Sequence, residues 1–168
     1  YFTDKNRHTL NKLSYGGDGT DYTSNWTFSR VAGVENSRKH MWDDFHDDGN
    51  GSNEVAFTTG YDFNSAIFNH PSTLTYDALN DRMIISTGSF WDDWDEKARI
   101  QIADFANQKV YSLRVGRFLE ATTNNWPNFG QIGIDSKGAL YVPIADYNRV
   151  IKVDFTYDNN GKPIYGKE

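Results

Sequence analysis

The sequence predicts an all-β fold made of antiparallel meanders, and three observations support this prediction. The first is the stretch 125–155, which reads as three short strands: an alternating segment 131–135, an apolar run 139–144 and an alternating segment 150–155. Turn-forming residues fill the two gaps, namely Ser136, Lys137 and Gly138 in the first and Asp146, Tyr147 and Asn148 in the second. Short strands joined by tight turns are typical of an antiparallel sheet.

The second observation is a repeated turn. Residues 3–7 read TDKNR, residues 145–149 read ADYNR, and an alternating segment follows each of them. A degenerate third copy ends at Arg99, which opens an alternating segment of its own. We therefore predict that a strand is led by each of three arginines, Arg7, Arg99 and Arg149, with Asn148 in the preceding turn. These arginines are expected to pair with neighbouring acidic groups or carbonyls rather than with a ligand.

The third observation concerns the strand that opens each unit. Residues 71–77 read PSTLTYD and residues 129–135 read FGQIGID, so that apolar residues alternate toward a terminal aspartate. We interpret Asp77 and Asp135 as turn formers, because an aspartate carboxylate can accept hydrogen bonds from backbone N–H groups two residues further on. A repeat of roughly 40 to 50 residues is in the range of four-stranded propeller blades.

This order of features resembles the NHL repeat, a blade module of six-bladed β-propellers. Residues 125–155 match it best, residues 68–105 match it well, and residues 1–34 match its second half. The resemblance implies one propeller-type domain over residues 1–168, with the outer half of a blade at 1–34, a long linker at 35–67, a blade at 68–116 and a blade at 125–168. The last blade would take its fourth strand from residues near 162–165.

About two and a half blades make an incomplete ring, because a ring of six at ~40 residues per blade needs roughly 240 residues. An open arc exposes apolar sheet faces and unpaired strand edges. We therefore expect the chain to belong to a longer protein or an assembly, in which further blades or a protein partner complete the ring.

Composition excludes several partners. Lys and Arg number 17 against 23 Asp and Glu, and this net charge of -6 argues against nucleic acid. Cysteine is absent, which excludes disulfides and thiolate metal sites. No apolar run approaches the ~20 residues of a membrane-spanning helix, so no membrane insertion is expected. Asn25 and Asn50 begin Asn-x-Ser/Thr motifs, which are compatible with the secreted or periplasmic location that we expect.

Two insertions combine tryptophan with adjacent carboxylates, at residues 42–54 and 90–97. In a four-stranded meander both loops emerge at the same end of the blade. Indole rings can stack on a protein or a glycan, and carboxylates can accept hydrogen bonds from sugar hydroxyls. Packing within the loop is the alternative role for each Trp. The binding candidates are Trp42, Asp43, Asp44, Trp91, Asp92, Asp93 and Trp94.

The first insertion also offers a weak calcium motif, since hard oxygen ligands lie on a Gly-rich loop. The candidate ligands are Asp47, Asp48, Asn50 and Glu54. The spacing departs from an EF-hand, because Val55 or Phe57 stands where the bidentate Glu belongs. A solvated acidic turn is the competing interpretation, and no cofactor is otherwise expected.

Catalytic motifs are sparse. The four histidines, His8, His40, His46 and His70, show no HExxH or similar ligand spacing. An acid and base pair could be drawn only from the carboxylates of the two Trp loops. We expect a non-catalytic module for protein binding or scaffolding. The alternatives are a fragment of a lactonase-type or lyase-type propeller enzyme with a central metal, and a glycan-binding module.

Overall fold

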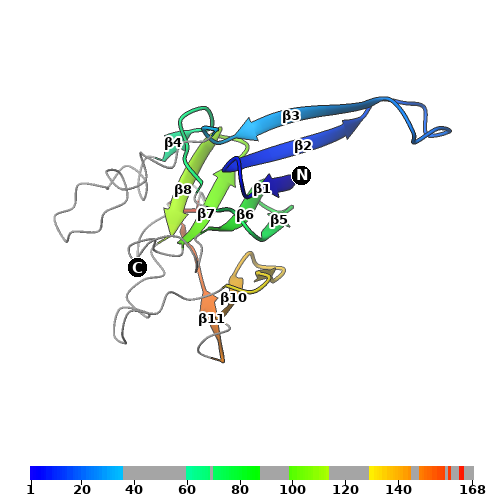
Figure 1. Ribbon diagram of the computed structural model, residues 1–168. Helices are drawn as coiled ribbons and strands as arrows, with labels where there is room; N and C mark the ends of the chain where they lie inside the picture. Colours follow the sequence, from blue (N-terminus) through cyan, green and yellow to red (C-terminus); the bar gives the residue numbers. More distant parts are fainter. Residues whose placement is uncertain are drawn as a thin grey trace.

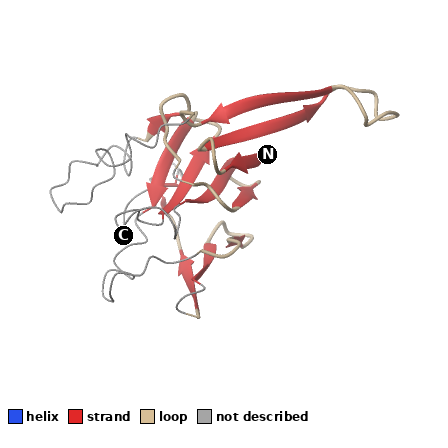
Figure 2. Ribbon diagram, viewed as in Figure 1, coloured by secondary structure: helices blue, strands red, loops and turns tan. Residues whose placement is uncertain are grey.

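The computed structural model describes residues 1–35, 60–68, 70–87, 99–113, 129–144, 148–157, 159 and 163–164. Every regular element in these ranges is a β-strand (Figure 2). All strand pairs are antiparallel. The predicted all-β, antiparallel class is therefore confirmed.

The strands form three sheets and a separate small hairpin (Figure 1). The first sheet contains β1 (Phe2–Asp4), β2 (Thr9–Tyr15) and β3 (Trp26–Ala32) in that order. The middle sheet has the order β4-β8-β7-β6-β5, from strands β4 (Tyr61–Asp62), β5 (Leu74–Asp77), β6 (Arg82–Thr87), β7 (Arg99–Asp104) and β8 (Lys109–Leu113). The third sheet contains β9 (Gly133–Ile134), β10 (Leu140–Ile144) and β11 (Arg149–Val153). The hairpin pairs β12 (Thr156–Tyr157) with β13 (Pro163–Ile164).

A loop of four residues closes four of the hairpins. The strand ends that face each other across it are Asp4 and Thr9, Asp77 and Arg82, Asp104 and Lys109, and Ile144 and Arg149. The last loop residue is left-handed each time, with φ of 60° at His8, 47° at Asp81, 52° at Gln108 and 50° at Asn148. Four-residue loops built around a tight turn are a standard hairpin connection. The chain therefore uses one hairpin loop length in all three sheets.

Aspartates at the strand ends stabilise these turns. The Asp4 carboxylate accepts from the backbone N–H groups of Asn6 and Arg7 at 3.1 and 3.0 Å. The Asp77 carboxylate likewise accepts from Leu79 N at 3.1 Å. Asp104 does the same for Asn107 N at 3.0 Å. Local bonds of this kind satisfy backbone donors that the ladder leaves unpaired.

Asp135 closes the shorter turn of the third sheet. Its carboxylate accepts from Lys137 N at 2.9 Å and from Ala139 N at 3.0 Å. Gly138, the last residue of this three-residue turn, has a φ of 84°. A glycine in this position is favoured because it adopts a left-handed conformation without a steric penalty. Asp77 and Asp135 both therefore make the turn contacts expected of turn formers.

The middle sheet is buried on both faces, because successive residues of a strand point to opposite sides. All six residues of β6 are buried. One face packs against the third sheet in a cluster that contains Ile84, Ile100, Ile102, Tyr111, Leu113, Ile132, Leu140 and Val142. The other face packs against the first sheet in a cluster that contains Leu10, Ala32, Ala66, Phe68, Met83, Ile85, Ala103 and Val110. The three sheets thus stack face to face, and Figure 1 shows them one above another.

The sheets approach one another along one common edge, formed by β1, β5 and β9. Thr75 Oγ1 on β5 donates to the carbonyl of Ile132, next to β9, at 2.7 Å. Gln131 Nε2 donates to the carbonyl of Leu74 at 3.0 Å. On the other side, Thr3 Oγ1 on β1 lies 3.4 Å from the carbonyl of Ser72. One edge strand of each sheet, namely β1, β5 and β9, therefore lies on the same side of the stack.

Three expectations from the sequence need correction: the position of Arg7 in the repeat, the linker 35–67 and the last strand of the third sheet. Arg7 lies in the turn, not at the head of a strand, since β2 begins at Thr9. The segments TDKNR and ADYNR match in sequence but occupy different positions in their hairpins. The first residue after the four-residue loop is Thr9 in one hairpin and Arg149 in the other, so Arg149 corresponds to Thr9 and not to Arg7. The expected linker 35–67 contains a strand, β4, which pairs with β8 as a fifth strand.

The third correction concerns the end of the chain. The strand near 162–165 exists as β13, but it pairs with β12 and not with β11. Within the part of the chain that the structure describes, the third sheet therefore has three strands rather than four. The reason is that Thr156 and Tyr157 turn back to pair with the Pro163–Ile164 segment, which forms a separate hairpin.

Burial of the middle sheet on both faces can be tested with two neighbouring residues. Ile84 and Ile85 are both completely buried but belong to opposite clusters. Replacing either by Ala should lower the free energy of unfolding by about 2–5 kcal/mol, because each substitution leaves a cavity. Urea unfolding measures this, with Leu79→Ala on the exposed β5–β6 turn as the control. A near-neutral Ile84→Ala or Ile85→Ala variant would show that one face is open to solvent.

Candidate functional site

The binding and metal residues expected from the sequence lie outside the described residues. The candidates Trp42, Asp43 and Asp44, together with Asp47, Asp48, Asn50 and Glu54, fall in residues 36–59. Trp91, Asp92, Asp93 and Trp94 fall in residues 88–98. The protein-binding, glycan and calcium roles of these loops therefore stay predictions.

Within the described ranges, no group of three or more His, Asp or Glu side chains is placed so that it could hold a metal ion. The same ranges contain no helix of the length and apolar character needed to cross a membrane.

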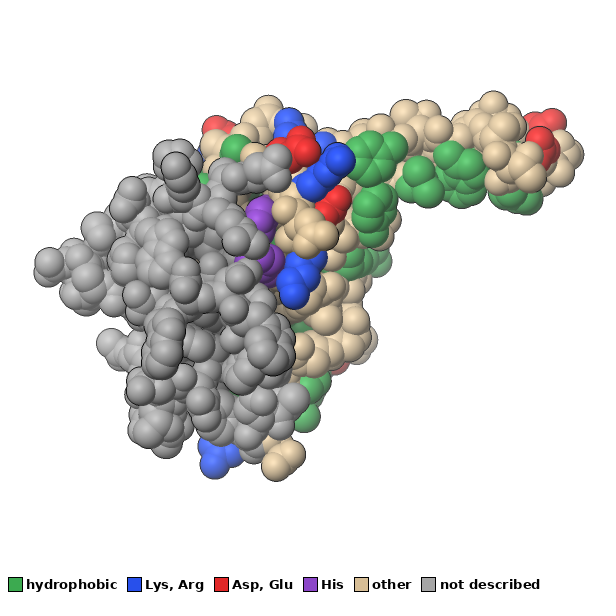
Figure 3. Space-filling view, in the orientation of Figure 1, with side chains coloured by type: hydrophobic (Ala, Val, Ile, Leu, Met, Phe, Trp, Pro, Cys, Tyr) green, Lys and Arg blue, Asp and Glu red, His purple; other side chains and the backbone are tan. Residues whose placement is uncertain are grey.

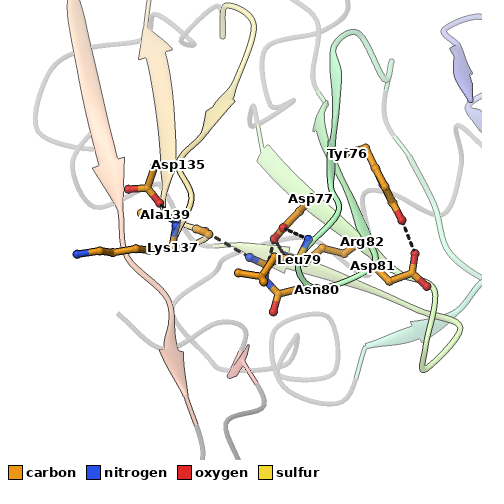
Figure 4. Close-up of polar contacts among 10 residues, drawn as sticks. Tyr76, Asp77, Leu79, Asn80, Asp81, Arg82, Asp135, Lys137 and Ala139 are labelled. Atoms are coloured by element: carbon orange, nitrogen blue, oxygen red, sulfur yellow. Dashed lines mark hydrogen bonds and ion pairs between the residues drawn. The ribbon is translucent and has the colours of Figure 1, made fainter.

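The strongest polar contact in the described core is an ion pair that sequence reasoning missed. Arg82 Nε lies 2.7 Å from Asp77 Oδ2, and both side chains are almost completely buried (Figure 4). Arg82 also reaches the third sheet, where its Nη2 donates to the carbonyl of Gly138 at 3.4 Å and its guanidinium lies 4.1 Å from the ring centre of Phe155. This arginine therefore ties the β5–β6 hairpin to the next sheet. A signal for the pair was available, namely an Asp followed five residues later by a basic residue across a hairpin loop.

The predicted repeat arginines play more modest parts. Arg7 lies on the surface, with its Nε 3.5 Å from Glu35 Oε1 and 3.9 Å from Asp4 Oδ2. Exposed ion pairs of this kind contribute little to stability. Arg99 begins β7 opposite Thr87, and Arg149 begins β11 as an exposed residue.

A buried histidine pair joins the first sheet to the middle sheet. His8, in the β1–β2 loop, and His70, before β5, are both buried, and their ring centres lie 4.8 Å apart. His8 Nδ1 accepts a hydrogen bond from the backbone N–H of His70 at 3.2 Å. Because an accepting nitrogen carries no proton, this contact places the proton of a neutral His8 on Nε2. The sequence gave no hint that His8 and His70 lie together.

The most prominent exposed surface is the ribbon formed by β2 and β3, which we call the arm (residues 12–29). It projects beyond the body of the protein (Figures 1 and 3). Cross-strand pairing sets Leu13 opposite Phe28 and Tyr15 opposite Trp26. Directly paired residues share one face of a sheet, so these four form an apolar face. The positions between them, Lys12, Ser14, Thr27 and Ser29, form the polar face.

The apolar face of the arm points away from the middle sheet at its base. Leu10 and Ala32 contact the middle sheet, and Leu13 lies three residues after Leu10, which places it on the opposite side of β2. Phe2 on β1 extends this outward face, with its ring centre 5.8 Å from that of Phe28. Four of these side chains remain substantially exposed: Phe2 by 38%, Leu13 by 47%, Trp26 by 46% and Phe28 by 56%. Figure 3 shows hydrophobic side chains gathered along one side of the arm.

The tip of the arm is acidic and locally ordered. Asp18 accepts from the hydroxyl and backbone N–H of Thr20, and Asp21 accepts in the same way from Thr23. These hydrogen bonds, led by those from the two threonine hydroxyls, lower the pKa of both carboxyl groups. Both aspartates therefore carry full negative charge at neutral pH. The Trp26 indole N–H donates to the carbonyl of Tyr22 at 2.9 Å, which holds the tip against the first residue of β3.

A second exposed apolar surface lies at the other end of the stack. On β10, Leu140, Val142 and Ile144 are buried against the middle sheet or its edge, so Tyr141 and Pro143 face outward. Their partners across the ladder are Lys152 and Val150 on β11. Tyr141 is 39% exposed and Val150 is 63% exposed. A hydrogen bond to Asp154 raises the pKa of Lys152, so this lysine stays cationic.

Comparison of the chain with protein-family models, with curated proteins and with solved structures finds no match. The resemblance to NHL repeats is therefore carried by the residues of this chain alone.

The buried ion pair allows a direct test. Arg82→Met should lower the free energy of unfolding by about 3–5 kcal/mol, because it leaves the Asp77 carboxylate buried without its partner. Adding Asp77→Asn to that variant should restore part of the loss, since the uncompensated charge is then removed. Denaturant unfolding of the wild type, both single variants and the double variant gives the interaction free energy between Arg82 and Asp77.

Lys109→Met is the matched control for this cycle. Lys109 occupies the same position in the β7–β8 hairpin, but its ion pair with Asp62 is exposed. An exposed pair contributes about 0–1 kcal/mol. If Arg82→Met cost no more than Lys109→Met, the buried pair would not hold the two sheets together.

Proposed function

We propose that this chain is part of a β-propeller of NHL-like blades and serves as a non-catalytic module for protein binding or scaffolding. One observation carries the proposal: three antiparallel sheets stack face to face, and one edge strand of each (β1, β5 and β9) lies along a common edge. Radially arranged sheets whose inner strands converge are the architecture of a propeller. The middle sheet, with β5 to β8 as consecutive neighbours, has the strand order of a blade.

The repeated hairpin loop supports the same proposal. The first, middle and third sheets each contain it. Chains that repeat one supersecondary unit bury a continuous core only by stacking neighbours. The resemblance of residues 68–105 and 125–155 to NHL repeats fits this arrangement, because β5–β7 and β9–β11 fall within these two segments.

A binding role is favoured by the surface rather than by a pocket. Both ends of the stack expose large apolar side chains, and the arm adds more of them on one face. Large exposed apolar patches are typical of surfaces that contact other proteins. The two Trp and Asp loops offer a further contact surface, with protein as the first partner class. The module would work outside the cytoplasm, in a secreted or periplasmic assembly.

Partner binding tests this function. The tagged chain is used to capture proteins from an extracytoplasmic fraction, and each captured protein is purified and titrated back by calorimetry. We expect one partner to bind with a saturable isotherm, and a Trp91→Ala/Trp94→Ala variant to bind at least about thirtyfold more weakly, as for removal of interface hot spots. A matching thermal melt would show that this variant is folded.

Tyr22→Ala is the matched control, because Tyr22 is an exposed aromatic residue of the arm tip and belongs to neither loop. It should leave the affinity unchanged. Absence of any saturable protein partner would contradict the binding function. Equal affinity of the wild type and the Trp91→Ala/Trp94→Ala variant would show that the partner contacts a surface other than that loop.

A further inference from the structure

We infer that two copies of this chain associate end to end, with the outward face of the first sheet of one copy packed on the outward face of the third sheet of the other. This inference rests on the proposed propeller architecture and names the first partner of the module, a second copy of the same chain. Its surfaces are the first-sheet face (Phe2, Leu13, Trp26 and Phe28) and the third-sheet face (Tyr141, Pro143, Val150 and Lys152).

Both faces have the character of a sheet-packing surface. The first-sheet face carries alternate apolar residues at paired positions of β2 and β3, as Leu13 and Phe28 show. The third-sheet face pairs Pro143 with Val150 on β10 and β11. Phe2, Leu13, Trp26 and Phe28 on the first-sheet face and Tyr141 and Val150 on the third-sheet face are exposed, whereas Thr9 and Asn11, nearer the start of β2 on the same face as Leu13, are buried. The sheet between the two faces is covered on both sides. A second copy would continue at each end the same packing that the chain already makes twice internally.

The size of the surface is sufficient for a specific contact. A large aromatic side chain buries about 150–250 Å². With three aromatic side chains and Leu13 roughly half exposed, the first-sheet face offers on the order of 400 Å² of apolar surface. A specific complex buries about 800 Å² per partner including its polar rim, and the apolar centre of such an interface is smaller than the whole. A patch of this size lies within the range of the largest apolar patch of a typical monomer, and such patches are often functional.

The arrangement also closes on itself. In a twofold dimer the first-sheet face of each copy meets the third-sheet face of the other, so both contacts are identical and no apolar end remains. Two copies supply six stacked sheets, which lies within the four to eight blades of closed propellers. Three copies would supply nine. The common edge of β1, β5 and β9 then lies toward the axis in both copies.

The amphipathic arm suits this dimer. Its apolar face would lie along the partner, while the polar face with Lys12, Ser14, Thr27 and Ser29 stays in solvent. The acidic tip formed by Asp18 and Asp21 would reach beyond the contact and remain hydrated. An amphipathic ribbon that projects from the body has no partner within the described part of its own chain for its apolar face.

Sedimentation equilibrium of the purified chain tests the inference. We expect a particle of twice the chain mass of 19.2 kDa. Phe28→Asp and Val150→Asp each place a charge in one of the two contacts, and each should weaken the dimer at least about thirtyfold, as removal of an interface hot spot does. Thr27→Asp and Ser29→Asp are matched controls, because they flank Phe28 on the polar face of the arm, and they should leave the dimer intact.

Mixing the two charged variants separates this dimer from other modes of association. The intact first-sheet face of Val150→Asp can meet the intact third-sheet face of Phe28→Asp, so an equimolar mixture should form heterodimers that neither variant forms alone. This recovery also shows that both variants are folded. A symmetric contact between two arms predicts instead that Val150→Asp dimerises by itself and that mixing recovers nothing.

A monomeric wild type, or a dimer insensitive to Val150→Asp, would overturn the inference. Neither result would bear on the proposed binding function, which the capture experiment tests on a different protein partner. Loss of partner capture with an intact dimer would in turn contradict that function and leave the dimer standing.

Discussion

The structure depends on burial of the middle sheet on both of its faces. Strand β6 has no solvent-facing side, and its residues alternate between two clusters, with Ile84 facing the third sheet and Ile85 facing the first. Within the described residues, neither outer sheet has another sheet packed on its outward face. Apolar burial is the main favourable contribution to folding, so the outer sheets are held in place largely by their contact with the middle one. This dependence makes the ends of the stack, rather than its centre, the natural places for partners.

Directional contacts fix how the sheets sit on one another. Apolar packing alone tolerates sliding, whereas hydrogen bonds and ion pairs do not. The Asp77–Arg82 pair, together with the hydrogen bond from Arg82 to the Gly138 carbonyl, fixes the position of the third sheet on the middle sheet. The hydrogen bond between His8 and the backbone of His70 fixes the position of the first sheet. A buried arginine is costly unless its donors are used, and this cost would penalise alternative arrangements of the hairpin. Fold specificity and sheet placement are thus carried by a few polar groups inside an apolar stack.

Much of the fold could be predicted from the sequence. Alternation predicted β5, β7 and β11 with small errors at their ends, because their apolar residues follow the period of two, and an apolar run predicted β10. Asp77 and Asp135 were recognisable as turn residues from their place after an alternating run. Arg7 was assigned to the wrong register because a short motif match does not count loop residues, and the loop length decides which residue begins the strand. The fifth strand β4 and the β12–β13 hairpin have only two residues per strand, too few for a pattern.

The candidate surfaces were harder to predict, for a physical reason. Sequence reasoning selected Trp residues beside carboxylates, which lie outside the described residues. It passed over Phe2, Leu13 and Phe28, which read as ordinary core residues of a strand. Only the pairing of β2 with β3, and the projection of the arm beyond the body, show that these side chains are exposed. Exposure is a property of the tertiary arrangement and leaves no local mark on an alternating strand.

The stack of three sheets is tested most directly by methyl NMR of the isoleucine-labelled and leucine/valine-labelled chain. The account predicts that Ile84 methyl groups show nuclear Overhauser contacts with Leu140 and Val142 of the third sheet, while those of the adjacent Ile85 show contacts with Leu10 of the first. Contacts of both isoleucines with the same sheet, or of Ile84 with neither Leu140 nor Val142, would contradict it.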